Sequence, residues 1–320
     1  MRVVLALGSG GARGYAHIGV IEELRERGHE IVGVAGSSMG ALVGGLQAAG
    51  RLDEFTDWAR TLTQGAVLRL LDPSLSAAGV LRAEKIIDVV RELIGDVAVE
   101  DLPIPFTAVA TDLITGRSVW LQRGRLDDAI RASIAIPGVV APHVLHGRLL
   151  ADGGILDPIP MAPIAAVHAD RTIAVSLGGE DPQAYRAPAV RPTAERWNRM
   201  WRNTSASILD TKAVRALRET QPGKAMLGRV ADLLESEFVD VDAESPPAPR
   251  LGGFDVMNRT IDIAQSALAR HTLAAYPPDL LIEIPRTVCR TLEYYRAAEV
   301  IAAGRQQTAA ALDAAAAIDR

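Results

Sequence analysis

The chain has 320 residues, of which 48% are hydrophobic and 23% are charged, and this composition predicts a globular protein with a substantial core. The net charge of −5 gives no basic footprint for nucleic acid phosphates, so nucleic acid binding is not expected. The single cysteine, Cys289, excludes an intrachain disulfide framework and a zinc–cysteine cluster. The apolar run at residues 3–7 is too short for a signal peptide, so we expect a cytoplasmic location.

Two strand-to-helix units occupy the beginning of the chain. Short apolar runs at residues 3–7 and 30–35 predict strands, and each is followed by a glycine-containing turn and a segment with helical character. Gly28 and Gly50 are suited to cap these two helices at their carboxyl ends. Because consecutive strand–helix units favour a parallel sheet with helices on its faces, the pattern predicts an α/β fold.

The rest of the chain continues with strands and helices. Helices are predicted at 84–93 and 254–276, and the alanine-rich tail at 308–320 is predicted to be a fraying helix. Proline-rich stretches at 181–192 and 244–253 are predicted to be loops that bracket a helical insertion. Further strands are predicted at residues 106–111, 118–122, 149–151, 172–177 and 280–284.

The sequence GSSMG at residues 36–40 matches GxSxG, in which a serine stands on a sharp turn between a strand and a helix. The flanking glycines, Gly36 and Gly40, allow that strained turn, which exposes the serine hydroxyl at the end of the strand. Ser38 is therefore the predicted nucleophile, and the amide dipoles of the following helix favour negative charge beside it. Ser37 is the neighbouring alternative, and a glycine-rich helix start without chemistry would have the same pattern.

A serine nucleophile needs a general base, and none of the six histidines stands in a context typical of that role. Asp152 follows an apolar run and precedes Gly153 and Gly154, so a carboxylate at a strand end could be held against the serine hydroxyl. An ordinary Asp-Gly turn would have the same sequence. Asp112 and Asp157 are the rival carboxylates.

A glycine-rich segment, SGGARG at residues 9–14, directly follows the first predicted strand. Its adjacent glycines, Gly10 and Gly11, let backbone N–H groups converge on one point, as an oxyanion hole or a phosphate cradle requires. Both ligands are compatible with this segment alone. A dinucleotide site is disfavoured, because Ser9 replaces the first glycine of GxGxxG and no acidic residue stands at the tip of the next strand.

Taken together, these motifs resemble those of the patatin-like phospholipase family, in the bacterial branch similar to the catalytic domain of neuropathy target esterase. The resemblance covers residues 3–180 in order and spacing. It rests on GSGGARG at 8–14, GSSMG at 36–40, ASIAIPGVVAP at 132–142 and DGG at 152–154, with the ATDL and TGR segments around Asp112 and Arg117.

The resemblance implies a three-layer α/β/α fold with a mainly parallel central sheet and a C-terminal helical extension. The expected organisation is a catalytic core at 3–180, a helical insertion at 181–253 and, at 254–320, a closing helix, strand and C-terminal helix of the same domain.

For the site, the resemblance implies a dyad in which Ser38 is the nucleophile and Asp152 is the general base. It also implies an oxyanion hole from the loop residues Gly10, Gly11, Arg13 and Gly14. The departure from the family pattern is Ser9, which stands where many members have glycine. Because Gly10 and Gly11 remain, we expect the hole to be intact.

The expected function is hydrolysis of acyl esters by a phospholipase or lysophospholipase that releases fatty acids from lipids, with no cofactor and no metal. We expect an acyl-ester substrate, a location in the cytoplasm or at the inner membrane surface, and peripheral membrane contact. An acyltransferase or thioesterase is the second enzyme hypothesis, and His143 or His146 beside Ser38 would favour acyl transfer. A regulatory adaptor that keeps the fold is the non-enzyme hypothesis. The oligomeric state is not predicted.

One segment of the insertion has two readings. Trp197, Met200 and Trp201 share a helical face that arginines flank, which suits a membrane interface or an acyl-chain entrance. An amphipathic helix packed on the core would show the same pattern.

Overall fold

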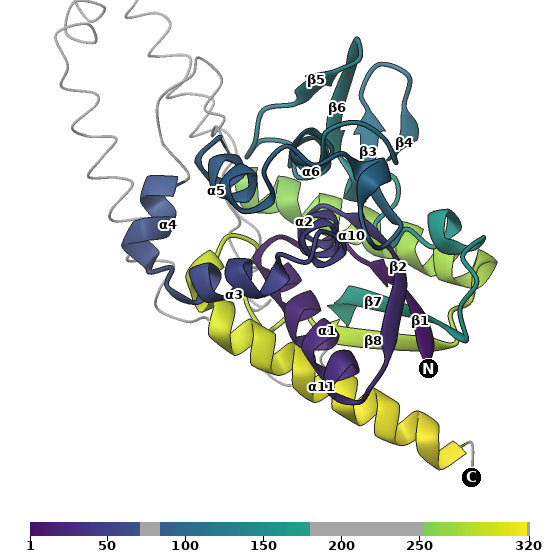
Figure 1. The fold of residues 1–320 in the computed structure, drawn as a ribbon. Coiled ribbons are helices and arrows are strands. Elements are labelled where there is room, and N and C mark those ends of the chain that lie inside the picture. Colours follow the sequence, from purple (N-terminus) through teal and green to yellow (C-terminus); the bar gives the residue numbers. More distant parts are fainter. Residues whose placement is uncertain (71–83, 180–252, 319–320) are drawn as a thin grey trace, which may run out of the picture. The chain divides into compact units, whose positions relative to one another are not determined.

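The computed structural model describes residues 1–70, 84–179 and 253–318 (Figure 1). The strands are β1 (Arg2–Leu7), β2 (Glu30–Ser37), β3 (Phe106–Asp112), β4 (Arg117–Leu121), β5 (His143–Leu145), β6 (Arg148–Asp152), β7 (Arg171–Gly179) and β8 (Leu280–Pro285). The α-helices are α1 (Ala16–Glu26), α2 (Met39–Ala48), α3 (Leu52–Arg60), α4 (Gln64–Leu70), α5 (Glu84–Ile94), α6 (Leu126–Ser133), α10 (Gly253–Ala275) and α11 (Ala297–Ile318). The expected insertion, with its face of Trp197, Met200 and Trp201, lies outside the described residues.

The strands form one mixed sheet whose central part is parallel. β3, β2, β1, β7 and β8 lie side by side in that order, and each neighbouring pair is parallel. β4, β5 and β6 join as antiparallel strands at the β3 end. The mainly parallel α/β fold expected from the sequence is therefore confirmed.

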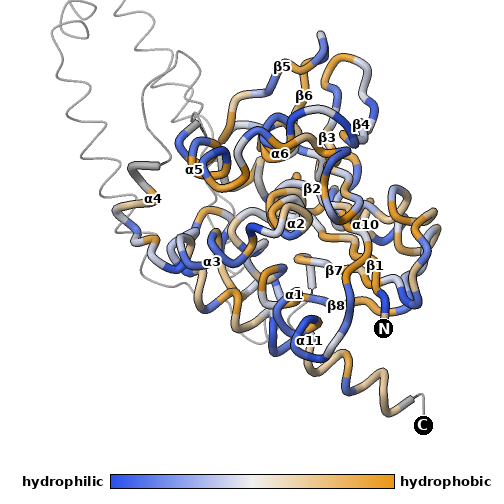
Figure 2. Tube along the Cα trace, viewed as in Figure 1, coloured by the Kyte–Doolittle hydropathy of each residue, from blue (hydrophilic) through white to orange (hydrophobic). Residues whose placement is uncertain are grey.

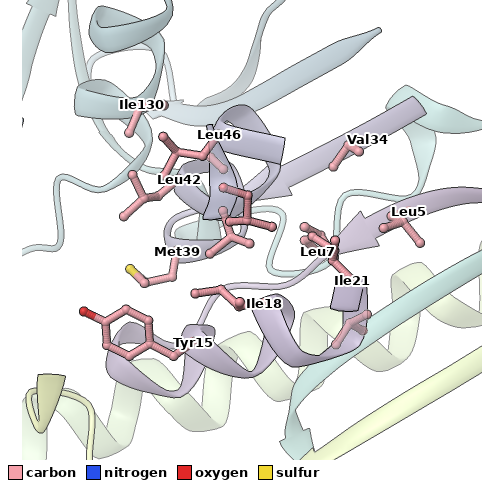
Figure 3. Close-up of a cluster of buried hydrophobic side chains, with 14 of the residues drawn as sticks. Leu5, Leu7, Tyr15, Ile18, Ile21, Val34, Met39, Leu42, Leu46 and Ile130 are labelled. Carbon is pink, nitrogen blue, oxygen red and sulfur yellow. The ribbon is translucent and has the colours of Figure 1, made fainter. Parts of the chain in front are cut away.

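Successive side chains of β1 point to opposite faces of the sheet, and the core therefore has two layers. Leu5 and Leu7 point into the large apolar cluster that α1, α2 and α11 share, and Figure 3 shows both among the side chains of this cluster. Val4 and Ala6 point to the opposite face, where Ala269 and Leu273 of α10 help to cover the sheet. Figure 2 shows the apolar central strands between helices that carry polar stretches. The sheet is thus a middle layer with helices on both faces.

β3 brings the ends of β2 and β6 together. Residues Val34–Ser37 of β2 pair with the first part of β3, up to Val109. Ala110–Asp112 then pair with β6, which runs in the opposite direction and ends at Asp152 opposite Ala110. Since β4 occupies the other edge of β3 along both parts, β2 and β6 must lie on the same side and meet end to end.

The C-terminal tail differs from the sequence expectation of a fraying helix at 308–320. α11 begins already at Ala297, and it packs closely against α1. A Cβ on Gly19 of α1 would collide with the backbone of α11, and a Cβ on Gly304 of α11 would collide with the backbone of α1. These two glycines permit a close helix crossing, and buried Thr308 and Leu312 extend the packed stretch. The expectation of fraying is therefore wrong for this part of the helix.

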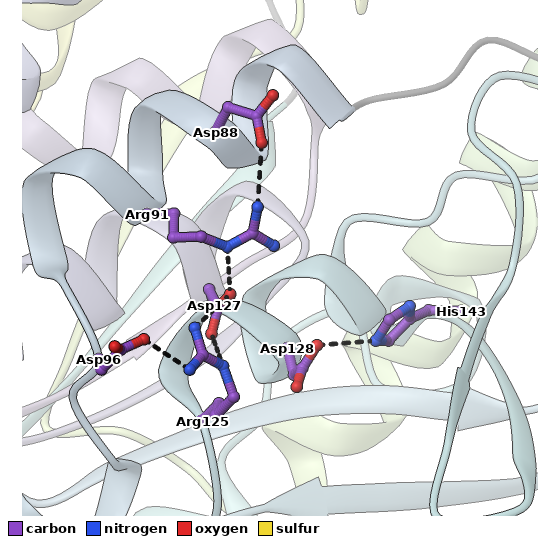
Figure 4. A network of polar contacts seen from close by, with 7 residues as sticks. All are labelled: Asp88, Arg91, Asp96, Arg125, Asp127, Asp128 and His143. Atoms are coloured by element: carbon purple, nitrogen blue, oxygen red, sulfur yellow. Dashed lines mark hydrogen bonds and ion pairs between the residues drawn. The ribbon is translucent and has the colours of Figure 1, made fainter.

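Several elements had no counterpart in the sequence expectations, namely α3, α4, α6 and the short strand β5. Ion pairs connect the first turn of α6 to α5 and to the preceding residue. The buried carboxylate of Asp127 accepts hydrogen bonds from Arg91 of α5 at 2.8 Å and from Arg125 at 3.0 Å (Figure 4). Burial alone would raise the pKa of Asp127, but the hydrogen bonds from Arg125 and Arg91 outweigh burial and lower this pKa. α6 is thereby held against α5 at the end of the sheet that carries the candidate site.

Candidate active site

Ser38 stands on a strained turn between β2 and α2. Its φ of 56° and ψ of −124° place a non-glycine residue in a region that L-residues rarely adopt. A Cβ on Gly36 would collide with the backbone carbonyl of Gly40, and a Cβ on Gly40 would collide with the carbonyl of Leu7. Both glycines of the GxSxG pattern are therefore required by backbone contacts that fix the turn.

The junction on β3 places Ser38 beside Asp152. Ser38 follows the last residue of β2, and Asp152 is the last residue of β6, so the two side chains come from strand ends that face each other. The Oγ of Ser38 donates a hydrogen bond to the Oδ2 of Asp152 at 2.5 Å. Both residues are almost completely buried, at 2% and 4% exposure. The structure thus brings together the two residues that the sequence motifs singled out.

The carboxylate of Asp152 is held on both oxygens. Its Oδ1 accepts the backbone N–H of Gly154 at 2.7 Å, and Gly153 lets this turn fit tightly because a Cβ there would collide with the backbone of Val109. Burial raises the pKa of Asp152 to about 6, and the hydrogen bonds from Ser38 and Gly154 oppose that shift. A carboxyl group with this pKa is mostly ionised at neutral pH and is a stronger base than an exposed aspartate.

Ser133, at the carboxyl end of α6, supports the turn and was not singled out by the sequence analysis. Its Oγ accepts the backbone N–H of Ser38 at 2.9 Å and donates to the carbonyl of Val109 at 2.5 Å. Ser133 therefore links the turn to β3. The only sequence signal was its place within residues 132–142, one of the segments that carry the family resemblance.

The glycine-rich loop lies against the same turn. A Cβ on Gly14 would collide with the side chain of Met39, which follows Ser38 in the chain. The loop is anchored by neighbouring backbone, since the N–H groups of Ser9 and Ala12 donate to the carbonyls of Pro158 and Thr291. Among the described residues, no acceptor is assigned to the N–H groups of Gly10 and Gly11, which leaves two donors in this loop.

The side chain of Arg13 connects the glycine-rich loop to α10. Its Nε donates to the carbonyl of Gly10 at 3.2 Å, and its Nη2 lies 3.4 Å from the carboxylate of Asp262 on α10. His17 adds a second support, because its buried imidazole is hydrogen-bonded to the carbonyl of Gly8 at 2.8 Å. Burial lowers the pKa of His17 to about 4, so this imidazole is neutral at physiological pH.

The rival residues have other partners. Ser37 donates its hydroxyl proton to the backbone carbonyl of Asp157 at 2.6 Å. Asp112 accepts the backbone N–H groups of Thr115 and Ile114, and these hydrogen bonds lower its pKa, as in a carboxylate that caps a turn. Burial raises the pKa of Asp157 to about 6, and this residue contacts Ser37 through its backbone carbonyl.

The two histidines considered for an acyltransferase are not bonded to Ser38. His143 lies 3.2 Å from the carboxylate of Asp128 on α6 (Figure 4), and His146 is an exposed residue in the turn between β5 and β6. Within the described residues, the hydroxyl of Ser38 donates to Asp152 and no histidine is bonded to it.

An apolar cleft leads to Ser38. Apart from Ser38 its walls are apolar or aromatic, and Tyr294 closes one side; burial and the charge of Asp152 raise the pKa of that phenol. The cleft is lined by Tyr15, Ser38, Met39, Leu42, Phe55, Trp58, Leu62, Val67, Ile86, Ile134, Ile136, Val139, Val140 and Tyr294. Such a surface suits a hydrocarbon chain.

A second, polar cavity of about 290 Å³ lies at the carboxyl ends of β1 and β7. Ser9 lines it from the glycine-rich loop, and Arg270 of α10 and Arg286 after β8 supply guanidinium groups. The Oγ of Ser9 is buried with no hydrogen-bond partner among the described residues. The same edge of the sheet thus carries an apolar cleft and a polar cavity.

Comparison with known proteins places this α/β fold among the hydrolases of carboxylic esters. The family model of patatin-like phospholipases matches residues 5–165, and the chain belongs to this family. The chain is 62% identical to an NTE family protein of Mycobacterium tuberculosis, over 98% of this chain and 92% of that protein. The family resemblance expected from the motifs is thereby confirmed.

More distant relatives are named after lipid esterases. The chain is 34% identical to a lysophospholipase of Mycosarcoma maydis, over 58% of this chain and 10% of that protein. It is 31% identical to a neuropathy target esterase of Drosophila melanogaster, over 55% of this chain and 13% of that protein.

In the parts of the chain that the structure describes, no helix is long and apolar enough to cross a bilayer, and no group of His, Cys, Asp and Glu could hold a metal ion.

Proposed function

We propose that the protein is a serine esterase of lipids in which Ser38 is the nucleophile and Asp152 the general base. The hydrogen bond of 2.5 Å between the two side chains carries this proposal. The raised pKa of Asp152 supports it, because a stronger base favours transfer of the hydroxyl proton, and the strained turn fixes the position of the Ser38 side chain.

In the proposed reaction Asp152 takes the proton of the Ser38 hydroxyl while the oxygen attacks the ester carbonyl carbon. The N–H groups of Gly10 and Gly11 stabilise the negative carbonyl oxygen of the tetrahedral intermediate. Asp152 returns the proton to the leaving alcohol, and an acyl-serine remains. Water then attacks this ester, its proton passes to Asp152, and the fatty acid leaves as Ser38 is reprotonated.

The two cavities favour a substrate with an apolar and a polar end. The cleft at Ser38 would hold the acyl chain, and the arginine-containing cavity at Ser9 would face the polar headgroup. A phospholipid or lysophospholipid has this shape, and a phosphate is a suitable partner for guanidinium groups. The name of the fungal relative, lysophospholipase, agrees with this substrate class.

The test is hydrolysis of p-nitrophenyl butyrate, with fluorophosphonate labelling followed by mass spectrometry. We expect Ser38→Ala to lose the label and all but about one part in ten thousand of the activity. Ser37→Ala is the matched control, because it removes the neighbouring hydroxyl and should keep the label. Labelling that persists in Ser38→Ala would overturn the proposal, and a folded wild type with neither label nor turnover would favour the adaptor hypothesis.

A further inference from the structure

Two hairpins lie side by side beyond the candidate site. The first joins β3 to β4, and the second joins β5 to β6 (Figure 1). Asp112 at the end of β3 pairs with Arg117 of β4 on one side and with Leu150 of β6 on the other. The N–H of Leu113 also donates to the carbonyl of Leu149 at 2.9 Å, so the two hairpins are joined close to their tips.

Large apolar side chains are exposed on these hairpins. Ile114 is 77% exposed and Leu113 is 44% exposed at the tip of the first hairpin, and Trp120 on β4 is 46% exposed. Val144 on the second hairpin is 67% exposed. Together these four residues are called the hairpin surface below. Exposed aliphatic groups at turns with a nearby tryptophan are typical of segments that enter a lipid interface.

The stretches 113–121 and 143–151 of the two hairpins contain arginines and no Asp or Glu, although the whole chain is acidic. No Asp or Glu occurs between Asp112 and Asp127, or between Asp128 and Asp152. Arg117 and Arg148 are exposed in these stretches, whereas Arg123, after β4, interacts with Glu100. Asp112 is engaged with the N–H groups of its own turn. A surface that is apolar and basic matches a membrane with anionic headgroups.

We propose that the hairpin surface docks the enzyme on an anionic lipid bilayer. This inference rests on the proposed function only for the statement that the substrate is a lipid. Trp120 lies opposite Val109, which lies opposite Ser37, so three adjacent strands connect the surface to the candidate site. At the usual strand spacing this separation is about 10 Å. Docking there brings Ser38 close to the lipids that it would cleave.

The experiment measures binding of the full chain to vesicles by flotation. We expect stronger binding to a phosphatidylcholine–phosphatidylglycerol mixture than to pure phosphatidylcholine, and weaker binding at high salt. The variant Ile114→Ser/Val144→Ser should bind about tenfold more weakly, because two apolar groups no longer enter the interface. Arg117→Gln/Arg148→Gln should lose about fivefold per arginine on the anionic vesicles.

A matched control is Ile263→Ser, because Ile263 on α10 is 61% exposed and lies outside the hairpin surface. It should bind vesicles like the wild type. All variants should keep wild-type turnover of p-nitrophenyl butyrate, which shows that they fold. Unchanged vesicle binding by Ile114→Ser/Val144→Ser would overturn the proposal, as would a solution dimer that this variant dissociates. If Ser38→Ala loses esterase activity but still binds vesicles, both proposals are supported. A wild type that binds vesicles but never cleaves esters would overturn only the proposed function.

Discussion

The buried carboxyl group of Asp152 reduces the stability of the folded chain at neutral pH. Burial raises its pKa to about 6 from an ordinary value of 3.8. Between about pH 4 and about pH 6 the folded chain therefore binds more protons than the unfolded chain. Stability falls as the pH rises through this window, and above it a cost of about 3 kcal/mol remains.

We expect Asp152→Asn to raise stability while it removes activity. At neutral pH the amide has no charge to bury, and its oxygen can still accept the N–H of Gly154, so the free energy of unfolding should rise by up to about 3 kcal/mol. Turnover of p-nitrophenyl butyrate should fall by about 100- to 10,000-fold, because the amide takes no proton from Ser38. Urea unfolding and initial rates measure the two effects.

The pH dependence of the same two proteins provides the control. Near pH 4 the wild-type carboxyl group is largely protonated, so the stability of the two proteins should converge. The wild-type kcat/KM should fall about tenfold per pH unit below about pH 6, because the protonated carboxyl is no base. A variant that is less stable at neutral pH, or a wild-type rate that stays flat through pH 6, would contradict this account.

Single residues of the site differ in how far the sequence could predict them. Ser38 and Asp152 stand beside glycines that the local backbone requires, so short motifs mark them. Ser133 lies 95 positions after Ser38, and its role arises only when α6 packs against β3. Arg13 was expected in the oxyanion loop, and the contact of its side chain with Asp262, which is 249 positions away, was not foreseen. Long-range contacts of this kind leave no local pattern.

At the scale of secondary structure elements, the junction of β1, β2 and α2 is the tightest part of the site. The carbonyl of Leu7 in β1 occupies the space that a side chain on Gly40 would need, and Gly40 lies in the first turn of α2. We expect Gly40→Ala to lower the free energy of unfolding by more than about 3 kcal/mol, because backbone atoms of two elements would have to move apart. Urea unfolding followed by circular dichroism measures the loss.

Gly28→Ala is the comparison for this prediction. Gly28 follows α1 with a φ of +74°, and no atom lies within 4 Å of an added Cβ. The cost is then limited to the unfavourable left-handed backbone, about 1 kcal/mol. Equal losses in the two variants would show that backbone conformation and not the crowded junction requires Gly40.

Element prediction succeeded where the physical pattern is local. The apolar strands of the central sheet were found within a few residues, since strands buried on both faces are continuous apolar runs. β5 has three residues and follows a proline, so it offers too short a pattern. The packed length of α11 depends on glycines in two distant helices that meet only in the folded chain.

At the scale of the whole molecule, the apolar cleft is assembled from segments far apart in the chain. Its walls come from the 3₁₀ helix Gly11–Tyr15, α2, α3, α4, α5, the stretch after α6 and the 3₁₀ helix Tyr294–Arg296. No single segment of the sequence forms the cleft. The motifs therefore indicated an ester substrate but not the length of its acyl chain. Chain-length preference therefore tests the assembled fold.

Ile136, which is partly buried in the wall of the cleft after α6, is the position we would enlarge. Each methylene buried in the cleft contributes about 0.8 kcal/mol, about fourfold in kcat/KM, so the wild type should prefer longer p-nitrophenyl esters over the butyrate. In Ile136→Trp the indole fills space that the chain needs, and the gain per methylene should disappear while butyrate turnover changes little. Ile263→Trp adds the same indole on α10, outside the cleft, and should keep the wild-type preference. An unaltered chain-length profile in Ile136→Trp would mean that the acyl chain lies elsewhere on the enzyme.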